Sequence, residues 1–194
     1  MERVAAGLAL LLLAPFGAVV AIIIYFLSRS TPLVRHTRVG WRGAPLPMLK
    51  FRTMWSSGEV SGRLLAIENV SGEIPSTKGA ADTRVGSRFA AFCRRHSIDE
   101  LPQFFHVIRG EMSLVGPRPI TRAELEQYYR DCADEVVSVR PGISGLWQIM
   151  GRNDLTYAER KYLDLILVRE ASASLYFSIL VRSIPKVLSG SGSY

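Results

Sequence analysis

An uncharged apolar stretch at the start of the sequence, Val4 to Leu27, most limits what this chain can fold into. A straight helix over this stretch would be about 36 Å long at about 1.5 Å per residue, which is enough to cross the apolar layer of a bilayer, about 30 Å thick. Pro15 lies near its middle and lacks the amide proton that a continuous helix requires. The stretch can therefore form a single membrane span, or two half-length helices that enter and leave on the same face.

The charges around this stretch do not decide between the two arrangements. The arginines that follow it put its far end in the cytosol, whereas residues 1–3 are short enough to lie on either side; these arginines are Arg29, Arg35, Arg38 and Arg42. The composition becomes polar from Pro32 onward. We therefore divide the chain into a membrane-embedded helix at residues 1–30 and one cytosolic domain at residues 31–194.

Composition also bears on the partners. The formal net charge of +7 over 194 residues suits an anionic partner, such as lipid headgroups or a nucleotide diphosphate. Basic residues interleaved with Trp41 and Trp55 follow the apolar stretch, as is typical of the interfacial side of a membrane, so nucleic acid is the less favoured partner. Cys93 and Cys132 match no disulfide or zinc spacing, which favours a reducing environment.

Two adjacent carboxylates, Asp99 and Glu100, open an amphipathic segment. The apolar residues after them follow the spacing of one helix face: Leu101, Phe104, Phe105 and Ile108. Gly110 is placed to end this helix in a left-handed conformation, and residues 112–115 predict a short buried strand. Because a helix N-terminus stabilises a negative charge, we expect Asp99 to be ionised and nucleophilic, and the free amides there to suit a phosphate.

A structural explanation competes with this chemical one. Ser97 and Glu100 fit a capping box, in which each side chain bonds the backbone amide of the other residue. That arrangement implies no chemistry, and spacing alone favours it.

The remaining segments predict further elements. Residues 56–83 are rich in Ser, Gly and Glu and predict a surface loop with at most a short helix. The helix predicted at Arg122 to Asp131 carries acidic residues that are most simply explained as a solvated face: Glu124, Glu126, Asp131, Asp134 and Glu135. Thr156 and Glu159 predict the capped start of another helix, to about Val168.

Longer strings decide between the chemical and the structural explanation of the carboxylates. Residues 96–103 (HSIDELPQ) and 110–119 (GEMSLVGPRP) closely resemble the bacterial monotopic phosphoglycosyl transferases, which start glycan assembly on polyprenyl phosphate. Residues 49–54 (LKFRTM), 140–148 (RPGISGLWQ) and 151–154 (GRND) are similar to further motifs of that family. In the last of these, the family uses an arginine to help hold a diphosphate. For Trp147 itself we prefer the role of a core or interfacial anchor.

The resemblance implies a fold and a location. The fold is α+β and mostly helical, with a re-entrant N-terminal membrane helix, a small β element and amphipathic interfacial helices around a single cytosolic catalytic domain. Such a protein is monotopic on the cytoplasmic face of the bacterial inner membrane. The family breaks its re-entrant helix at a Ser-Pro pair, whereas this chain has Ala14 and Pro15. Leu175 to Leu188 predict a helix in the membrane interface, or equally a core helix.

The resemblance also implies the site residues and the reaction. Asp99 would attack the β-phosphorus of a UDP-sugar, UMP would leave, and polyprenyl phosphate would take the phosphosugar from Asp99. Glu100 would bind Mg²⁺ together with Asp99. The implied substrate-binding residues are Lys50, Arg52, Arg94, Pro117, Arg118, Pro119 and Arg152. The string at residues 145–148 is more similar to members that transfer galactose or glucose phosphate than to those that use acetamido sugars.

Two functions of other classes stay open at this point. A membrane-bound hydrolase of nucleotide-sugar diphosphates would form the same aspartyl intermediate but pass it to water. A non-catalytic membrane adaptor would keep the apolar helices and the basic surface without requiring the carboxylates.

Overall fold

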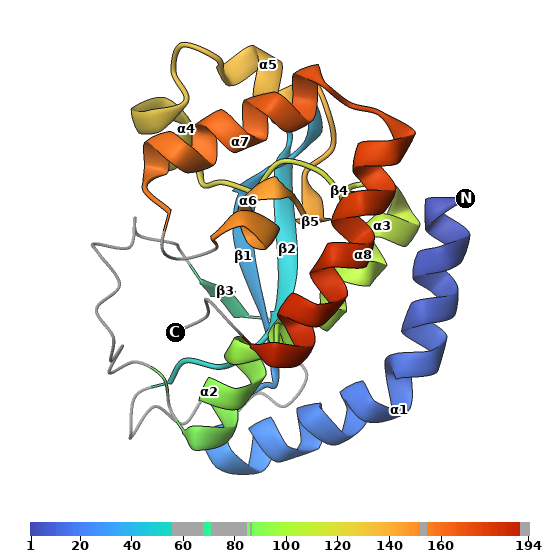
Figure 1. Ribbon diagram of the computed structural model, residues 1–194. Helices are drawn as coiled ribbons and strands as arrows, with labels where there is room; N and C mark the ends of the chain where they lie inside the picture. The colour runs from blue at the N-terminus through green and yellow to red at the C-terminus, as the bar shows by residue number, and fades with distance from the viewer. Residues whose placement is uncertain (56–67, 71–84, 86, 152–154, 191–194) are drawn as a thin grey trace.

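The computed structural model describes residues 1–55, 68–70, 85, 87–151 and 155–190 (Figure 1). Its elements in chain order are α1 (Glu2–Ser28), β1 (Leu33–Val39), η1 (Trp41–Gly43), β2 (Pro45–Phe51), β3 (Glu68–Val70), α2 (Arg88–Arg95), η2 (Ile98–Gln103), α3 (Phe104–Arg109), β4 (Ser113–Val115), α4 (Arg122–Tyr128), α5 (Ala133–Val137), β5 (Gly142–Ser144), α6 (Leu146–Met150), α7 (Tyr157–Arg169) and α8 (Ala173–Ser189). Both η elements are short 3₁₀-helices. The described part is mostly helical with two small sheets, as predicted for an α+β fold.

The apolar N-terminal stretch forms α1, a helix long and apolar enough to cross a membrane. Figure 1 shows that α1 has two legs that run in different directions. Pro15 lies inside the helix, and a proline there removes a backbone hydrogen bond and kinks the chain. Ala6 of the first leg and Val20 and Ile24 of the second are buried against the rest of the protein. Other apolar side chains of α1 stay exposed, among them Leu8, Leu11, Leu12, Phe16, Val19 and Phe26.

A β-hairpin carries the basic segment that follows α1. β1 and β2 pair antiparallel, with Lys50 opposite Val34 and Met48 opposite His36, and β3 pairs with β1 in parallel. Directly opposite residues share a face of a sheet, and so do alternate residues of one strand. Lys50, His36 and Arg38 therefore face the same side. Within the predicted loop of residues 56–83, the structure describes only the strand β3, and the rest of that loop lies outside the described residues.

The carboxylate segment folds nearly as predicted. The helix after Asp99 is divided into the 3₁₀-helix η2 and the α-helix α3, and Gly110 ends α3 with a φ of 75°, in the left-handed region. The strand β4 follows and pairs in parallel with β5. A Cβ added to Gly142 would lie 2.1 Å from the backbone nitrogen of Gly116, so the chain can approach this closely only at a glycine.

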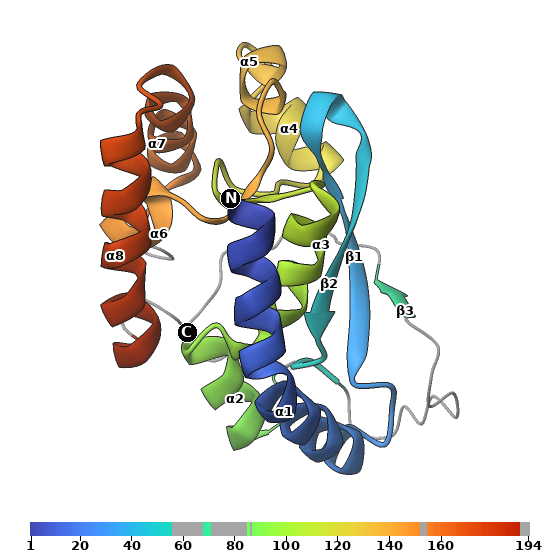
Figure 2. The ribbon, with the colours of Figure 1, turned by 90° about the vertical axis from the view of Figure 1, so that its right-hand side faces the viewer.

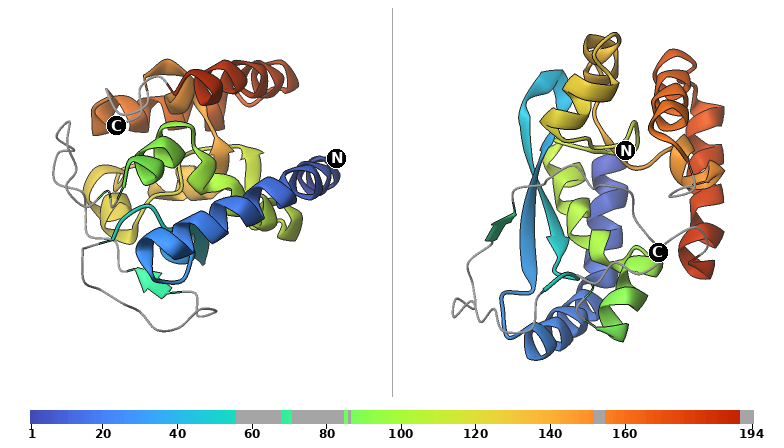
Figure 3. Two further views of the ribbon diagram at one scale, coloured as in Figure 1. Left: turned by 90° about the horizontal axis from the view of Figure 1, so that it is seen from below. Right: turned by 90° about the vertical axis from the view of Figure 1, so that its left-hand side faces the viewer.

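The described elements are arranged in three layers (Figure 2). The hairpin lies on one side, α1 and α3 lie in the middle, and α7 and α8 lie on the other side. The opposite view shows the same order, and the view from below places α1 and α8 on opposite sides of the molecule (Figure 3). The segment with the two carboxylates thus lies between the hairpin and the C-terminal helices.

Helix α7 confirms one prediction, and helix α4 corrects another. The capping box of Thr156 and Glu159 begins α7, which ends at Arg169. The prediction of a solvated face on α4 is wrong for Glu124, which is buried and forms a second capping box with Thr121. Its carboxylate turns back onto the start of its own helix, where burial is compensated by hydrogen bonds.

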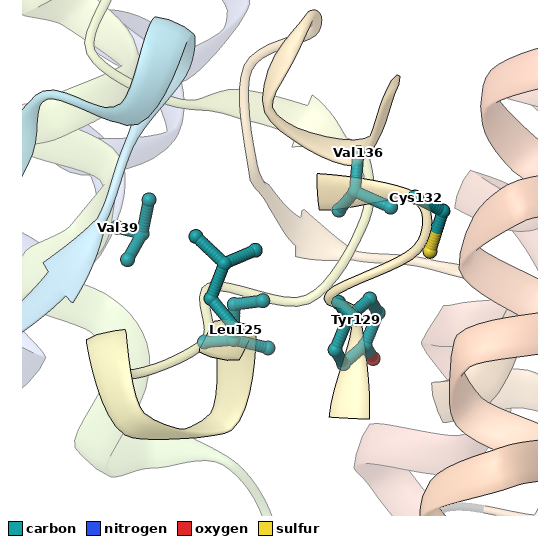
Figure 4. Packing of buried hydrophobic residues seen from close by; sticks show 6 residues of the cluster. Val39, Leu125, Tyr129, Cys132 and Val136 are labelled. Atoms are coloured by element: carbon teal, nitrogen blue, oxygen red, sulfur yellow. The ribbon is translucent and has the colours of Figure 1, made fainter. Parts of the chain in front are cut away.

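One face of the last helix belongs to the core, and the role of this helix in the membrane interface stays a prediction. In α8, Ile179 is fully buried in a cluster with Trp147 and Leu163, so this face belongs to the core and Trp147 is a core residue, as preferred from the sequence. The opposite apolar side chains are exposed: Phe177, Val181, Ile184 and Leu188. A separate cluster joins β1 to α4 and α5, with Val39, Leu125 and Tyr129 packed together (Figure 4).

Candidate active site

The hairpin and η2 bring one lysine to the two adjacent carboxylates. The Nζ atom of Lys50, on β2, lies 2.9 Å from Oε1 of Glu100 and 3.8 Å from Oδ2 of Asp99. Asp99 is only 8% exposed, whereas Glu100 is partly exposed. The structure thus joins residues that are about 50 positions apart in the sequence.

The carboxylates are not used in a capping box. Ser97 has a left-handed φ of 52° and its side chain forms no capping hydrogen bond. The amide of Glu100 instead donates to the carbonyl oxygen of Ser97, at 3.1 Å, and the carboxylate of Glu100 accepts from Lys50. The capping-box explanation is therefore wrong, and the left-handed backbone at Ser97 turns the chain sharply before Asp99.

Burial changes the proton affinity of Asp99. Removal from water raises the pKa of this carboxyl well above its usual value. The charge of Lys50 opposes the shift, that of Glu100 adds to it, and that of Arg94 opposes it again. The net direction is the opposite of what the helix-start argument predicts, because burial outweighs the favourable backbone hydrogen bond. Asp99 is thus a basic carboxylate surrounded by cations.

Further cations gather on the same face of the hairpin. Burial, together with the charges of Lys50, Arg38 and Arg94, lowers the pKa of His36 to about 4, so its imidazole is neutral near pH 7. From the sequence, Arg38 is expected only in a basic segment at the membrane interface, and His36 has no assigned role. The signal that could have placed both residues at this site is a hairpin that pairs Lys50 with Val34, together with the alternation of side chains along β1.

The loop after β4 brings a second group of arginines. The guanidinium of Arg118 lies 4.6 Å from the ring centroid of Trp147, and Arg38 forms an ion pair of 3.5 Å with Glu124. The Nε atoms of Arg38, Arg94 and Arg118 are buried and have no hydrogen-bond partner among the described residues. The charges of Arg38 and Arg94 both act on His36, and that of Arg118 acts on Arg38, so the three arginines lie near one another. Buried donors normally have acceptors, so this group suits a multivalent anion such as a diphosphate.

Comparison with known proteins identifies the family. The sequence profile described as "Bacterial sugar transferase" matches residues 1–190. The chain belongs to the bacterial sugar transferase family. Membership places it among transferases and confirms the resemblance found in the sequence.

Individual relatives of this sugar transferase have informative names. The chain is 39% identical over 196 residues to the exopolysaccharide production protein ExoY of Rhizobium meliloti, and the matched region covers 100% of the chain and 86% of ExoY. It is 42% identical over 178 residues to a UDP-galactose-lipid carrier transferase of Erwinia amylovora, covering 89% of the chain and 37% of that relative. It is 41% identical over 162 residues to an undecaprenyl-phosphate galactose phosphotransferase of Salmonella typhimurium, covering 82% of the chain and 34% of that relative.

The other predicted site residues of the sugar transferase lie as follows. Pro117 and Pro119 flank Arg118, and the carbonyl oxygen of Pro117 accepts from the amide of Gly142 at 2.9 Å. Arg52 is buried, and its Nε donates to the carbonyl oxygen of Thr31 at 2.8 Å, in the segment after α1. Arg152 lies outside the described residues. The substrate contacts of all these residues stay predictions.

The donor set of the sugar transferase fits Mg²⁺. This ion is commonly held by one or two protein carboxylates, with substrate phosphates and water completing its coordination. Asp99 and Glu100 supply two such groups at one place. Among the residues that the structure describes, no group of three or more His, Cys, Asp and Glu is placed to hold an ion. The site therefore suits an ion that binds together with a diphosphate.

Proposed function

We propose that this sugar transferase moves a sugar 1-phosphate from a UDP-sugar to polyprenyl phosphate through a covalent intermediate on Asp99. The observation that carries the proposal is the burial of Asp99 beside Lys50 and Glu100 and near Arg94, whose buried Nε has no hydrogen-bond partner among the described residues. The names of two relatives, a UDP-galactose-lipid carrier transferase and an undecaprenyl-phosphate galactose phosphotransferase, support this substrate pair. A hexose such as galactose or glucose is the expected sugar.

In the first step an oxygen of Asp99 attacks the β-phosphorus of the donor. The bond from this phosphorus to the oxygen that bridges it to the α-phosphate breaks, and UMP leaves with that oxygen and both bonding electrons. An acyl phosphate that carries the sugar remains on Asp99. The raised pKa of Asp99 makes its carboxylate more basic, and hence a better nucleophile, while the nearby charges of Lys50 and Arg94 keep a share of it ionised.

The surrounding groups offset the charge that builds up in this step. Arg118, Arg38 and Arg94 would bind the phosphate oxygens, because their guanidinium groups stay charged and present several donors. Asp99 and Glu100 would hold Mg²⁺, which supplies further compensation for the negative charge of the diphosphate. Lys50 holds Glu100 beside the nucleophile.

In the second step an oxygen of polyprenyl phosphate attacks the same phosphorus. The acyl phosphate bond breaks, Asp99 is regenerated as a carboxylate, and a polyprenyl diphosphate sugar is released. The acceptor phosphate lies at the membrane surface, so the nucleophile must lie there too. This need explains why the site is built directly beside α1.

The contacts at both ends of α1 support a re-entrant, monotopic arrangement. At one end, the carboxylate of Glu2 accepts from Oγ of Ser113 at 2.6 Å and from the hydroxyl of Tyr176. At the other end, the backbone of Thr31 accepts from Arg52. Both ends are thus fastened to the same domain, whereas a single span would carry one end to the opposite side of the bilayer. We infer that the chain lies on the cytoplasmic face of the bacterial inner membrane, with the exposed apolar side chains of α1 in one leaflet.

The decisive experiment looks for the covalent intermediate. UDP-galactose and UDP-glucose labelled in the β-phosphate are incubated with the membrane-bound protein and Mg²⁺, first without acceptor. We expect labelled protein and about one UMP per site. Added polyprenyl phosphate should then remove the label as a lipid product. Asp99→Asn should not be labelled, whereas Asp134→Asn, a change at an exposed carboxylate, should be labelled normally.

Other outcomes would contradict the proposal. Continuous release of free sugar phosphate without acceptor would identify a hydrolase. No UMP release with any sugar in a wider panel would favour an adaptor. UMP release with lipid product but no labelled protein would exclude the covalent route.

A further inference from the structure

A buried carboxylate in α7 takes no part in the two proposed steps of the transfer. Asp164 is 1% exposed and lies in the middle of this helix, on the same side as Leu163 and Leu167. Its Oδ1 accepts from the backbone amide of Arg118 at 3.1 Å, and its Oδ2 accepts from the hydroxyl of Tyr129 at 2.9 Å. One side chain therefore ties together α7, the end of α4 and the loop after β4.

The sequence of that loop makes the first of these bonds important. Pro117 and Pro119 have no backbone N–H, so Arg118 supplies the only amide proton of the three residues. Asp164 accepts that proton. The bond fixes the backbone of Arg118 and leaves its guanidinium on Trp147, with a buried Nε that has no partner among the described residues.

Tyr129 holds the carboxylate from the other side. This tyrosine is 1% exposed and packs with Leu125, Val39 and Val136 in the cluster that joins α4, α5 and β1 (Figure 4). A ring packed at this density cannot move without disturbing its neighbours. The hydroxyl of Tyr129 thus gives Asp164 a fixed partner.

An apolar residue at this helix position would avoid the cost of burying a charge. The protein nevertheless has a carboxylate at this position. It contacts the backbone of Arg118, the arginine assigned to the donor diphosphate. We propose that Asp164, held by Tyr129, is a positioning residue that sets the guanidinium of Arg118 for binding the diphosphate of the donor. This inference rests on the proposed function, because it assigns donor binding to Arg118.

The test compares Asp164→Leu with Asp164→Asn. Leucine removes both acceptors and leaves the amide of Arg118 and the hydroxyl of Tyr129 without them, so the variant should have a lower thermal midpoint, and binding is measured well below that temperature. The folded variant should bind UMP about tenfold more weakly by calorimetry, and raise KM for the UDP-sugar with little change in KM for polyprenyl phosphate. Asparagine keeps an oxygen for the amide of Arg118 and should restore binding to within about threefold of wild type. Glu170→Gln, at an exposed carboxylate that follows α7, is the matched control.

A double-mutant cycle separates positioning from a general structural effect. Arg118→Met alone should weaken UMP binding, and adding Asp164→Leu should weaken it no further, because Asp164 acts through Arg118. Tyr129→Phe should show a smaller loss, of about threefold, that also disappears in the Arg118→Met background.

Two results would overturn the inference. These are fully additive losses in the cycle, or unchanged UMP binding by a folded Asp164→Leu variant. If wild type released no UMP from any UDP-sugar, both this inference and the proposed function would fall. If wild type bound UMP and formed the labelled intermediate while the cycle was additive, only the positioning role would fall.

Discussion

Asp99 and Asp164 are two buried carboxyl groups with different surroundings. Burial raises the pKa of Asp99 above its usual value and that of Asp164 to about 6. The neighbours of Asp99 carry full charges, with Lys50 at 3.8 Å. The charges of Arg118 and Arg160 also act on Asp164, but each of its two oxygens accepts a hydrogen bond from a neutral donor, the amide of Arg118 and the hydroxyl of Tyr129.

The difference shows that a raised pKa does not by itself identify a nucleophile. Hydrogen bonds that occupy both oxygens make a carboxylate a structural acceptor, since attack on phosphorus would require breaking them. A carboxylate held among cations meets the same groups that bind a phosphorylated substrate, so binding brings the reacting atoms together. The neighbours of each carboxyl group, more than its proton affinity, separate chemistry from positioning.

The largest expected effect distinguishes Asp99 from Asp164 by the step that each one serves. Asp99→Asn should lower the rate of UMP release by at least about a thousandfold, because the amide is a poor nucleophile. Asp164→Asn should keep the covalent step and lose at most about threefold in donor binding. Quenched-flow measurement of UMP with saturating UDP-sugar tests both. Comparable losses of the covalent step in the two variants would mean that Asp99 and Asp164 do not differ in role.

The second effect concerns the pH dependence of stability, where the buried carboxyl groups should behave alike. The folded-state pKa of Asp164 is about 6 and its ordinary value is 3.8, so the folded protein binds this proton more tightly than the unfolded chain. Lowering the pH from about 6 to about 4 should therefore stabilise wild type relative to Asp164→Asn, by about 3 kcal/mol in the free energy of unfolding. Urea unfolding in detergent at pH 7, 5.5 and 4 measures the difference. Parallel curves for the two proteins would contradict the raised pKa.

A third effect tests the charged surroundings of Asp99. Lys50 is the largest influence that lowers the pKa of Asp99 against the effect of burial, and Arg94 is a smaller one. In Lys50→Met the pKa of Asp99 should rise, so the acid limb of the pH–rate profile should move upward by on the order of one pH unit. Arg94→Met should move it less. A profile unchanged in Lys50→Met would show that the ionisation of Asp99 does not limit the rate.

Features that depend on local spacing were predictable from the sequence. The left-handed end at Gly110 and the capping box at Thr156 depend on residues within one helical turn, and the structure has both. The strand at Ser113–Val115 was predicted to within one residue for the same reason. The capping box at Ser97 satisfied the same spacing rule but does not form, because Ser97 has a left-handed backbone where an N-cap residue is extended, and the carboxylate of Glu100 accepts from Lys50.

Features that depend on distant partners were not predictable from local pattern. The grouping of Lys50 with Asp99 followed only from family resemblance, because β2 ends at Phe51 and η2 begins only at Ile98, after α2. Glu124 is predicted in solvent, but it lies buried 3.5 Å from the guanidinium of Arg38 of β1, a partner that helix spacing does not reveal. For Asp164 the sequence holds one signal, a carboxylate on the same helix face as Leu163 and Leu167.

The smallest effect concerns a carboxylate that has the geometry of an ion pair without the burial. Oε1 of Glu126 lies 2.7 Å from Nε of Arg122, closer than Lys50 lies to Asp99, yet both side chains are largely exposed. Water screens such a pair and side-chain entropy opposes it, so Glu126→Gln should change the free energy of unfolding by less than about 0.5 kcal/mol. UMP release and its pH profile should stay at the wild-type values. A larger change in either would mean that short distance, without burial, is enough to couple a carboxylate to this site, and the contrast between Asp99 and Asp164 would then need another cause.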